Sequence, residues 1–322
     1  MKALTQERYG PPEVLALSDV AIPTAGEREV LVRVRAAGVD AGVWHVVAGM
    51  PYLVRGMGFG LRAPKNPTPG LDLSGVVEAV GPGVTRFAVG DEVLGIGRAT
   101  FAEYAVAVEG KLVRKPAGLS FEQAAAMPVS GITAVEAVRK AGVQPGERVL
   151  VTGAGGGVGS YVVQIAHAAG AHVTGLVAPE RVEAIRALGA DEAIDRTVEE
   201  VDARGPVYDV IIDIAGRRPL GQLRRAMTPR GRLLIVGGEG GGKVLGGFGR
   251  LFVAPIASLF VSQLLAGVTA HERLAELEEL AALVESGAVV PHVGRTYPLA
   301  AGADAVRDMH EGRALGKLVL TR

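Results

Sequence analysis

The clearest chemical pattern in the sequence is the segment RVLVTGAGGGVGS, residues 148–160, where an apolar stretch runs into a glycine-rich turn. Glycines permit a tight turn and a close backbone approach to a pyrophosphate, and the following helix offers unpaired N–H groups to the anion. Because a strand precedes the turn and a helix follows it, we expect a dinucleotide-binding turn rather than an ordinary glycine turn. The residues of this turn that we assign to the cofactor are Gly153, Gly156, Gly157, Val158 and Gly159.

The next expected strand indicates which dinucleotide would bind. Sites for NAD usually carry Asp or Glu about 20 residues after the turn, to hold the ribose 2′-hydroxyl. Here Leu176 and Val177 stand at that point and Arg181 follows. A guanidinium can bind a 2′-phosphate bidentately, so the pattern favours NADPH over NADH. Glu180 would repel that phosphate if its side chain pointed the same way. The alternative that Arg181 is only a solvated helix residue stays open.

Several other catalytic chemistries are excluded by residue type. The sequence has no cysteine, so disulfides, thiolate zinc sites and cysteine nucleophiles are absent. Its six histidines show no paired metal-ligand spacing, and His271 is not followed by a second histidine four residues on. No Gly-x-Ser-x-Gly motif is present, which argues against a serine hydrolase of that type.

The elements that must position this turn follow from the hydrophobic pattern. Up to about residue 120, short alternating stretches and breakers predict a β-rich domain of barrel or folded-sheet type. Ser120 and Gln123 then form a capping-box pattern, and strands alternate with helices from there on. Such alternation predicts a parallel, doubly wound α/β sheet. The strands that we expect lie at 30–36, 75–80, 92–96, 101–108, 148–152, 172–177, 207–214, 232–236 and 289–293, and the helices at 160–169, 180–188, 220–227 and 270–286.

The last thirty residues return to a mixed character, which predicts that they rejoin the first domain. We therefore expect a catalytic domain formed by residues 1–122 and 291–322, with a Rossmann dinucleotide-binding domain at 123–290 inserted into it. A chain of 322 residues fits two domains of ordinary size.

Charge and hydropathy limit the partners and the compartment. The formal net charge is zero, with 34 basic and 34 acidic residues, so nothing attracts nucleic acid by charge. The N-terminus lacks a signal-type apolar region, and together with the absence of cysteine this makes the cytoplasm the default expectation. The almost uncharged segment 251–268 is close to membrane-spanning length, but its Pro, Ser and Gln residues favour a buried or interface element over a membrane span.

Taken together, the motifs make the chain resemble the medium-chain dehydrogenase/reductase superfamily, and within it the zinc-independent quinone oxidoreductase-like and NAD(P)-dependent alcohol dehydrogenase branch. The resemblance covers essentially the whole chain and implies a Rossmann domain set in a GroES-like catalytic domain, usually with homodimerisation through an edge of the Rossmann sheet. The matching segments are AAGVDAGVWHVVAGMPYLVR (36–55), GLDLSGVVEAVGPGVTRFAVGDEVLG (70–95), FAEYAV (101–106), PVSGITAVEAV (128–138), VLVTGAGGGVGSYVVQIAHAAGA (149–171) and GRALGKLVL (312–320).

The same resemblance argues against zinc. Zinc-dependent relatives place cysteine, histidine and cysteine around a catalytic metal, and those positions fall on Asp40, Leu71 and on or near Ala126. Leu71 cannot bind a metal, so we expect no metal site.

The resemblance also implies the remaining site residues. Asp40, His45 and Tyr52 lie on the segment that lines the substrate cleft in relatives, and we take them as the candidate catalytic residues. Turn, surface or packing roles remain their alternatives. Ser130 and Thr133 are implied beside the cofactor. The site also includes Gly237 and Gly238, which begin the glycine-rich run 237–242 after a sheet strand and are expected to pass the nicotinamide. The role of Lys317 stays open.

The sequence thus predicts an enzyme in which NADPH delivers hydride to a quinone, enone or related small carbonyl substrate without zinc. One alternative is alcohol or aldehyde oxidoreduction with NAD(P) and without zinc. Another is a non-catalytic NADPH-binding protein with a structural or regulatory role.

Overall fold

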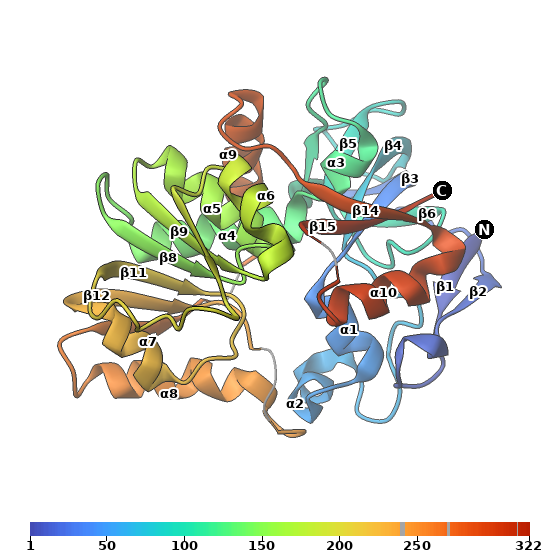
Figure 1. The fold of residues 1–322 in the computed structure, drawn as a ribbon. Coiled ribbons are helices and arrows are strands. Elements are labelled where there is room, and N and C mark those ends of the chain that lie inside the picture. Colours follow the sequence, from blue (N-terminus) through green and yellow to red (C-terminus); the bar gives the residue numbers. More distant parts are fainter. Residues whose placement is uncertain (239–241, 269–270, 314) are drawn as a thin grey trace. The chain divides into compact units, whose positions relative to one another are not determined.

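The computed structural model describes residues 1–238, 242–268, 271–313 and 315–322 (Figure 1). Parts of three sequence expectations lie outside these residues: 239–241 in the glycine-rich run, Ala270 in an expected helix and Ala314 in the C-terminal motif. The chain forms two compact units, which are described separately here. The first unit comprises Met1–Ile132, Glu272–Ser286 and Pro291–Arg322, and the second comprises Thr133–His271 and Gly287–Val290.

The first unit is built on a sheet in the order β14-β15-β3-β4-β5-β7, with β6 pairing to β3 (Figure 1). A separate two-stranded sheet joins β1 (Lys2–Thr5) to β2 (Ala16–Asp19). The strands of the main sheet are β3 (Glu29–Val39), β4 (Asp72–Val80), β5 (Glu92–Ile96), β6 (Tyr104–Val108), β7 (Leu112–Arg114), β14 (Val293–Pro298) and β15 (Lys317–Thr321). The helices of this unit are α1 (Ala41–Ala48), α2 (Tyr52–Val54), α3 (Phe121–Ala125), α9 (Leu274–Glu285) and α10 (Gly302–His310).

The alternating pattern of β3 explains its place at the centre of this sheet. Val30, Val32 and Val34 are buried in one apolar core, where each large aliphatic side chain contributes about 1.5–3 kcal/mol on burial. The expected capping box is confirmed at the start of α3, where Ser120 and Gln123 each accept a hydrogen bond from the other's backbone N–H.

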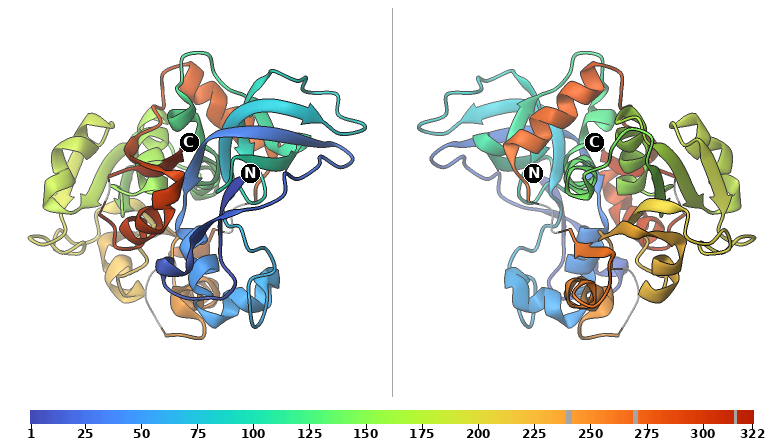
Figure 2. Two further views of the ribbon diagram at one scale, coloured as in Figure 1. Left: turned by 90° about the vertical axis from the view of Figure 1, so that its right-hand side faces the viewer. Right: turned by 90° about the vertical axis from the view of Figure 1, so that its left-hand side faces the viewer.

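Both ends of the chain lie side by side on the first unit (Figure 2). The Glu103 carboxylate joins them, because it accepts a hydrogen bond from the Lys2 N–H at 2.9 Å and pairs with Arg322 at 3.1 Å. The C-terminal residue after β15 is therefore linked through Glu103 to the N-terminal strand β1.

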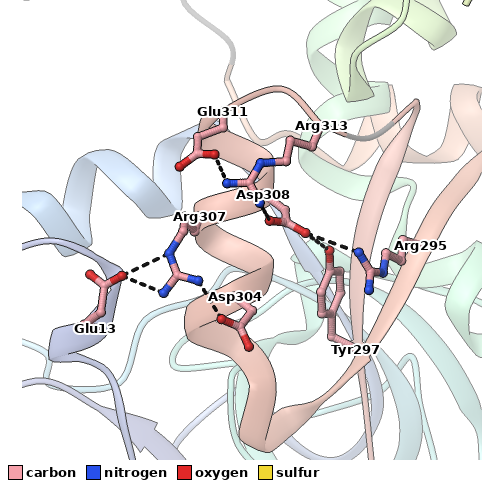
Figure 3. Close-up of polar contacts among 8 residues, drawn as sticks. All are labelled: Glu13, Arg295, Tyr297, Asp304, Arg307, Asp308, Glu311 and Arg313. Carbon is pink, nitrogen blue, oxygen red and sulfur yellow. Dashed lines mark hydrogen bonds and ion pairs between the residues drawn. The ribbon is translucent and has the colours of Figure 1, made fainter. Parts of the chain in front are cut away.

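A polar cluster at α10 adds to this attachment (Figure 3). Asp308 on α10 accepts a hydrogen bond of 2.5 Å from the Tyr297 hydroxyl on β14, and it pairs with Arg313 at 2.8 Å and Arg295 at 3.4 Å. Burial raises the pKa of Tyr297 to about 12, and the neighbouring Asp308 carboxylate adds to the rise. The phenol therefore stays protonated and keeps donating its hydrogen bond.

The second unit is a parallel six-stranded sheet in the order β10-β9-β8-β11-β12-β13, which confirms the doubly wound α/β fold (Figure 1). Its strands are β8 (Arg148–Thr152), β9 (His172–Val177), β10 (Glu192–Asp195), β11 (Tyr208–Asp213), β12 (Met227–Ile235) and β13 (Leu264–Gly267). Its helices are α5 (Gly157–Ala168), α6 (Val182–Ala187), α7 (Leu220–Ala226) and α8 (Gly249–Ser258), and α4 (Pro128–Ala141) begins in the first unit and ends in the second.

Three local expectations need correction. Helix α5 begins at Gly157 rather than at residue 160, because the glycine turn itself forms the helix N-terminus. The strand expected at 289–293 lies later, at β14, where it pairs with β15. The segment 251–268 was expected to be a buried or interface element. It is divided between α8 and β13, and much of its apolar surface is exposed, so the buried alternative is wrong and the interface alternative stays a prediction. Among the described residues, no helix has the length and hydropathy of a membrane span.

Candidate functional site

The glycine turn of the second unit forms a narrow cradle between β8 and α5. Gly153 follows β8 with φ +69°, a conformation that L side chains rarely adopt. A Cβ on Gly159 would lie 2.2 Å from the Gly153 carbonyl oxygen, so only glycine lets the helix start this close to the turn. Gly156 is the N-cap of α5, and Gly157 and Val158 form its first turn, where backbone N–H groups lack helical partners. Unpaired backbone N–H groups at a helix N-terminus are a general feature of anion-binding turns.

The cradle lies where the strand order reverses. From β8 the chain proceeds to β9 and β10 in one direction, whereas β11, β12 and β13 lie on the other side. Doubly wound sheets bind ligands outside the carboxyl ends of the strands at such a point. Gly237 follows β12, and a Cβ there would lie 1.7 Å from the Ile214 carbonyl oxygen after β11. A Cβ on Gly238 would lie 2.9 Å from the Gly247 carbonyl carbon. The structure thus brings the loops after β11 and β12 together at this edge.

An ion pair that the sequence analysis missed lies at the same carboxyl ends of the strands. Thr152 ends β8 and donates a hydrogen bond of 2.5 Å to Asp213, which ends β11 and is fully buried. Arg250 on α8 lies 2.6 Å from the other carboxylate oxygen of Asp213 and donates to the Arg218 carbonyl oxygen at 2.9 Å. An aspartate at the end of an apolar strand was a signal in the sequence, but its partner 37 residues later was not.

A pair of arginines stands beyond the ends of β9 and β10. Arg181 follows β9, its side chain is only 15% exposed, and its Nε lies 3.8 Å from Glu180. Arg196 follows β10 and donates its backbone N–H to the Val177 carbonyl oxygen at 2.8 Å. Burial lowers the pKa of Arg181, and the charge of Arg196 lowers it further against the opposing effect of Glu180. The charge of Arg196 therefore acts on Arg181, and an anion that both guanidinium groups could reach would stabilise this arrangement.

Asp40 in the first unit is held in a buried polar cluster rather than facing solvent. It is 7% exposed and precedes α1 as its N-cap residue. Its Oδ1 contacts the Lys317 ammonium and accepts a hydrogen bond of 3.2 Å from the Ser130 hydroxyl. Lys317, which begins β15, is 2% exposed and also donates to the Ser130 Oγ at 3.0 Å. The structure thus joins Asp40 and Ser130, two residues that the sequence analysis had assigned to different roles.

Asp72 at the start of β4 completes this cluster and was missed by the sequence analysis. Its side chain is fully buried, with Oδ2 at 2.7 Å from the Lys317 Nζ, and its Oδ1 accepts the Val129 N–H at 2.8 Å. Burial raises the pKa of Asp72 well above its usual range, and the charge of Asp40 raises it further while Lys317 opposes both. Burial alone would lower the pKa of Lys317, but the two carboxylates outweigh it and raise that pKa.

His45 and Tyr52 have partners of their own. The His45 Nδ1 lies 2.7 Å from the Met50 carbonyl oxygen, and because a carbonyl only accepts, Nδ1 must carry the proton. Tyr52 begins α2, is 48% exposed and lies under the Arg55 guanidinium, 4.8 Å from its ring centroid. Trp44, beside His45 on α1, stacks on His310 of α10 with ring centroids 3.7 Å apart. Thr133 lies one turn after Ser130 on α4.

The comparisons with known proteins agree with this architecture. Residues 26–117 match the family model described as alcohol dehydrogenase GroES-like domain, and residues 188–320 match the one described as zinc-binding dehydrogenase. A quinone oxidoreductase of Lama guanicoe is 33% identical over 99% of this chain and 97% of its own length. A 2-methylene-furan-3-one reductase of Solanum lycopersicum is 35% identical over 99% of this chain and 79% of its own length.

Solved structures give the same result. The quinone oxidoreductase from Coxiella burnetii superimposes with a TM-score of 0.86 and 27% identity, covering 100% of this chain and 99% of that one. A mycobacterial protein complexed with NADPH superimposes with a TM-score of 0.85 and 26% identity, covering 100% of both chains.

The fold and the comparisons define an oxidoreductase enzyme whose GroES-like domain is of the alcohol dehydrogenase type and which uses a nicotinamide cofactor. More closely, the chain belongs to the medium-chain dehydrogenase/reductase superfamily, in its quinone oxidoreductase-like branch.

Proposed function

We propose that this enzyme reduces quinones, enones or related carbonyl compounds with NADPH and without zinc. The observation that carries the proposal is the position of Arg181 and Arg196 just beyond the ends of the neighbouring strands β9 and β10, on the same sheet as the glycine turn. A pair of guanidinium groups suits a 2′-phosphate, which NADH lacks. Relatives that share the whole chain are named for quinone and enone reduction, which supports this substrate class.

The residues present fit a dinucleotide. The turn formed by Gly153, Gly156 and Gly159 would hold the pyrophosphate through backbone N–H groups. Arg181 and Arg196 would hold the 2′-phosphate. We assign contacts nearer the nicotinamide to Gly237, Gly238, Ser130 and Thr133. When bound, NADPH supplies the hydride.

The residues present do not fit a catalytic zinc ion. At the three positions where zinc-dependent relatives carry ligands, the chain has Asp40, the apolar Leu71 and, on or near the third, Ala126. Asp40 is already paired with the Lys317 ammonium. One carboxylate oxygen that is shared with an ammonium is a poor start for a site that needs three or four ligands. We therefore derive no step through a metal.

The candidate catalytic residues are then left with orientation and proton chemistry. With its Nδ1 proton held by the Met50 carbonyl, His45 can gain or release a proton only at Nε2. The half-exposed Tyr52 can donate its hydroxyl hydrogen bond to a substrate oxygen, and Arg55 stabilises the ring that carries it. Asp40 contacts Ser130 and Lys317, and we propose that it takes part in the reaction together with these buried partners.

We assign the catalytic domain to residues 1–122 and 291–322 and the Rossmann domain to 123–290.

We further propose a homodimer formed at the β13 edge of the second sheet. An edge strand presents unpaired backbone groups, and large exposed apolar patches usually mark an interface. Both occur here, because β13 ends the sheet and α8 and the turn after it expose a row of large apolar side chains. These are Phe252, Val253, Ile256, Leu259 and Phe260.

The deciding experiment measures NADPH and NADH oxidation by the purified enzyme with 1,2-naphthoquinone, a 2-alkenal and a simple saturated aldehyde, with and without a chelator. We expect turnover of the quinone or the 2-alkenal with NADPH, unchanged by the chelator. Turnover of the saturated aldehyde alone would favour the alcohol dehydrogenase alternative. Tight NADPH binding without turnover of any acceptor would favour a non-catalytic nucleotide-binding protein.

A further inference from the structure

The buried cluster of the first unit holds more acid than base. Asp40, Asp72 and Lys317 are the charged groups whose contacts define it, and Ser130 and the Val129 N–H add only neutral hydrogen bonds. If both carboxyl groups were ionised, the cluster would carry one uncompensated negative charge. Burial of an unpaired charge costs several kcal/mol, and such sites take up a proton instead. The charge count alone therefore calls for one additional proton.

The positions of the two aspartates support the same conclusion. Asp40 Oδ1 and Asp72 Oδ2 both contact the Lys317 ammonium, so the two carboxyl groups lie close together, and the charge of Asp40 helps to raise the pKa of Asp72. Two ionised carboxylates repel each other in such an arrangement, which favours a proton on one of them. In addition, Asp40 Oδ2 is buried and accepts no hydrogen bond from an N–H or O–H donor of the described residues. A carboxyl proton shared between the two aspartates would supply a donor.

The local structure gives up stability to build this cluster. Asp40 is the N-cap of α1, a position where Asp normally accepts a backbone N–H, yet its side chain makes no capping hydrogen bond. A side-chain cap contributes about 1 kcal/mol. Residue 38, two positions before Asp40, must be glycine, because a Cβ there would lie 2.6 Å from Asp72 Oδ2. The side chain of Asp40 is thus used for the cluster instead of the helix that carries His45.

We propose that Asp40, Asp72, Ser130 and Lys317 form a proton-sharing site, in which the two carboxyl groups share one proton under the Lys317 charge and supply the proton that substrate reduction consumes. The inference rests on the proposed reductase function for its use, but not for the existence of the shared proton. Asp40 is the member through which the proton leaves, because it is 7% exposed whereas Asp72 is 0% and Lys317 is 2% exposed.

The step balances with a single proton. The cofactor supplies a hydride, which forms a C–H bond at the electrophilic carbon of the acceptor. The electron pair of the π bond that breaks moves to the acceptor oxygen, and this anion takes one proton. The site releases that proton as a carboxyl O–H bond breaks, which leaves both aspartates ionised, and it regains a proton from water. His292, whose carbonyl oxygen accepts the Lys317 N–H at 3.0 Å, is a further titratable group beside β15, but burial lowers its pKa and keeps it neutral.

The first test observes the proton directly and needs no activity. The full-length enzyme, labelled with ¹³C at the aspartate side-chain carboxyl carbon, is titrated by NMR from pH 5 to pH 8. We expect one aspartate resonance to keep the chemical shift of a protonated carboxyl at pH 7 and to disappear in Asp72→Asn. If every aspartate of the wild-type enzyme has a carboxylate shift at pH 7, the proposal is wrong, and this result does not depend on how any variant folds.

The second test asks whether the proton is used. Single-turnover reduction of 1,2-naphthoquinone by the NADPH complex is followed as a function of pH in wild type and in Asp72→Asn. Loss of a positioned proton donor typically costs about 10²- to 10⁴-fold in rate. We expect a loss in this range, a changed pH profile and an unchanged Kd for NADPH. Asp308→Asn is the matched control, since it also removes a buried, ion-paired carboxylate of the first unit. An unchanged rate and pH profile in Asp72→Asn would reduce the cluster to a structural ion pair.

The two proposals fail in different ways. If NMR shows a protonated aspartate but the enzyme does not oxidise NADPH with any of the acceptors, the shared proton stands and the reductase function is refuted. Turnover without a protonated aspartate refutes the shared proton and leaves the reductase function intact.

Discussion

Arg196→Ala removes one of the two guanidinium groups beyond β9 and β10 and leaves Arg181 in place. A hydrogen bond between charged groups contributes about 1.5–3 kcal/mol. At about 1.36 kcal/mol for each factor of ten, NADPH should bind about 10- to 150-fold more weakly. NADH has no 2′-phosphate, so its affinity should change by less than about two-fold. Glu180→Gln should act in the opposite direction, because it removes the carboxylate that competes for Arg181.

The assay is a fluorescence titration of both cofactors at constant ionic strength, with thermal unfolding as a test of the fold. Arg186→Ala is the matched control, because this arginine lies on the adjacent helix α6 and pairs only locally with Glu183 at 2.7 Å. If Arg196→Ala weakens NADPH and NADH equally, the residue supports the fold and does not recognise phosphate. If it weakens neither, the arginine pair is not the phosphate site.

Three further predictions concern the turn, a carboxylate and the dimer. Gly159→Ala should abolish measurable binding of both cofactors, because its Cβ would meet the Gly153 carbonyl at 2.2 Å, whereas the helical control Gly221→Ala should bind normally. Hydrogen bonds from backbone N–H groups lower the pKa of Glu109, so its stabilising effect is present above about pH 4.3 and is lost as pH falls below it. Chemical unfolding of Glu109→Gln should therefore show a loss of stability at pH 7 that becomes smaller as the pH is lowered below about 4.3. Phe260→Asp, at a side chain 82% exposed, should convert a dimer to a monomer in light scattering, and an unchanged mass would contradict the proposed interface.

Much of the fold could be predicted because its strands carry strong local patterns. The bounds of β5, β8 and β9 agree with the sequence expectation, since apolar runs or alternation end there at clear breakers. The strands β10 and β13 were missed because each has only four residues, and β10 also has a mixed composition, whereas the apolar β13 lies in a longer uncharged segment that begins with a helix. Their places at the two edges of the sheet depend on pairing with a neighbour, which is not encoded locally.

The candidate site was predictable only where it is continuous in sequence. The glycine turn is a local motif, and the structure gives it the expected form. The cluster around Lys317 joins residues from four separate segments, and nothing in the spacing of positions 40, 72, 130 and 317 relates them. Antiparallel pairing of β15 with β3, and of β3 with β4, is what brings their ends together. Lys317 could be noticed in the sequence, but its partners required the sheet register.

The two polar sites of this enzyme treat charge in opposite ways, and this difference bears on their roles. Beyond β9 and β10, the charge of Arg196 acts on Arg181 against the opposing charge of Glu180, so binding of an anion there would relieve repulsion between like charges. In the first unit, Asp40, Asp72 and Lys317 are buried and reach neutrality only by holding a proton. The first arrangement gains stability from a ligand that arrives with negative charge. The second is neutral only with its proton, so after releasing that proton it holds an uncompensated buried charge that drives it to take up another proton. A reductase needs both a place for an anionic cofactor and a source of one proton, and each arrangement is suited to only one of these tasks.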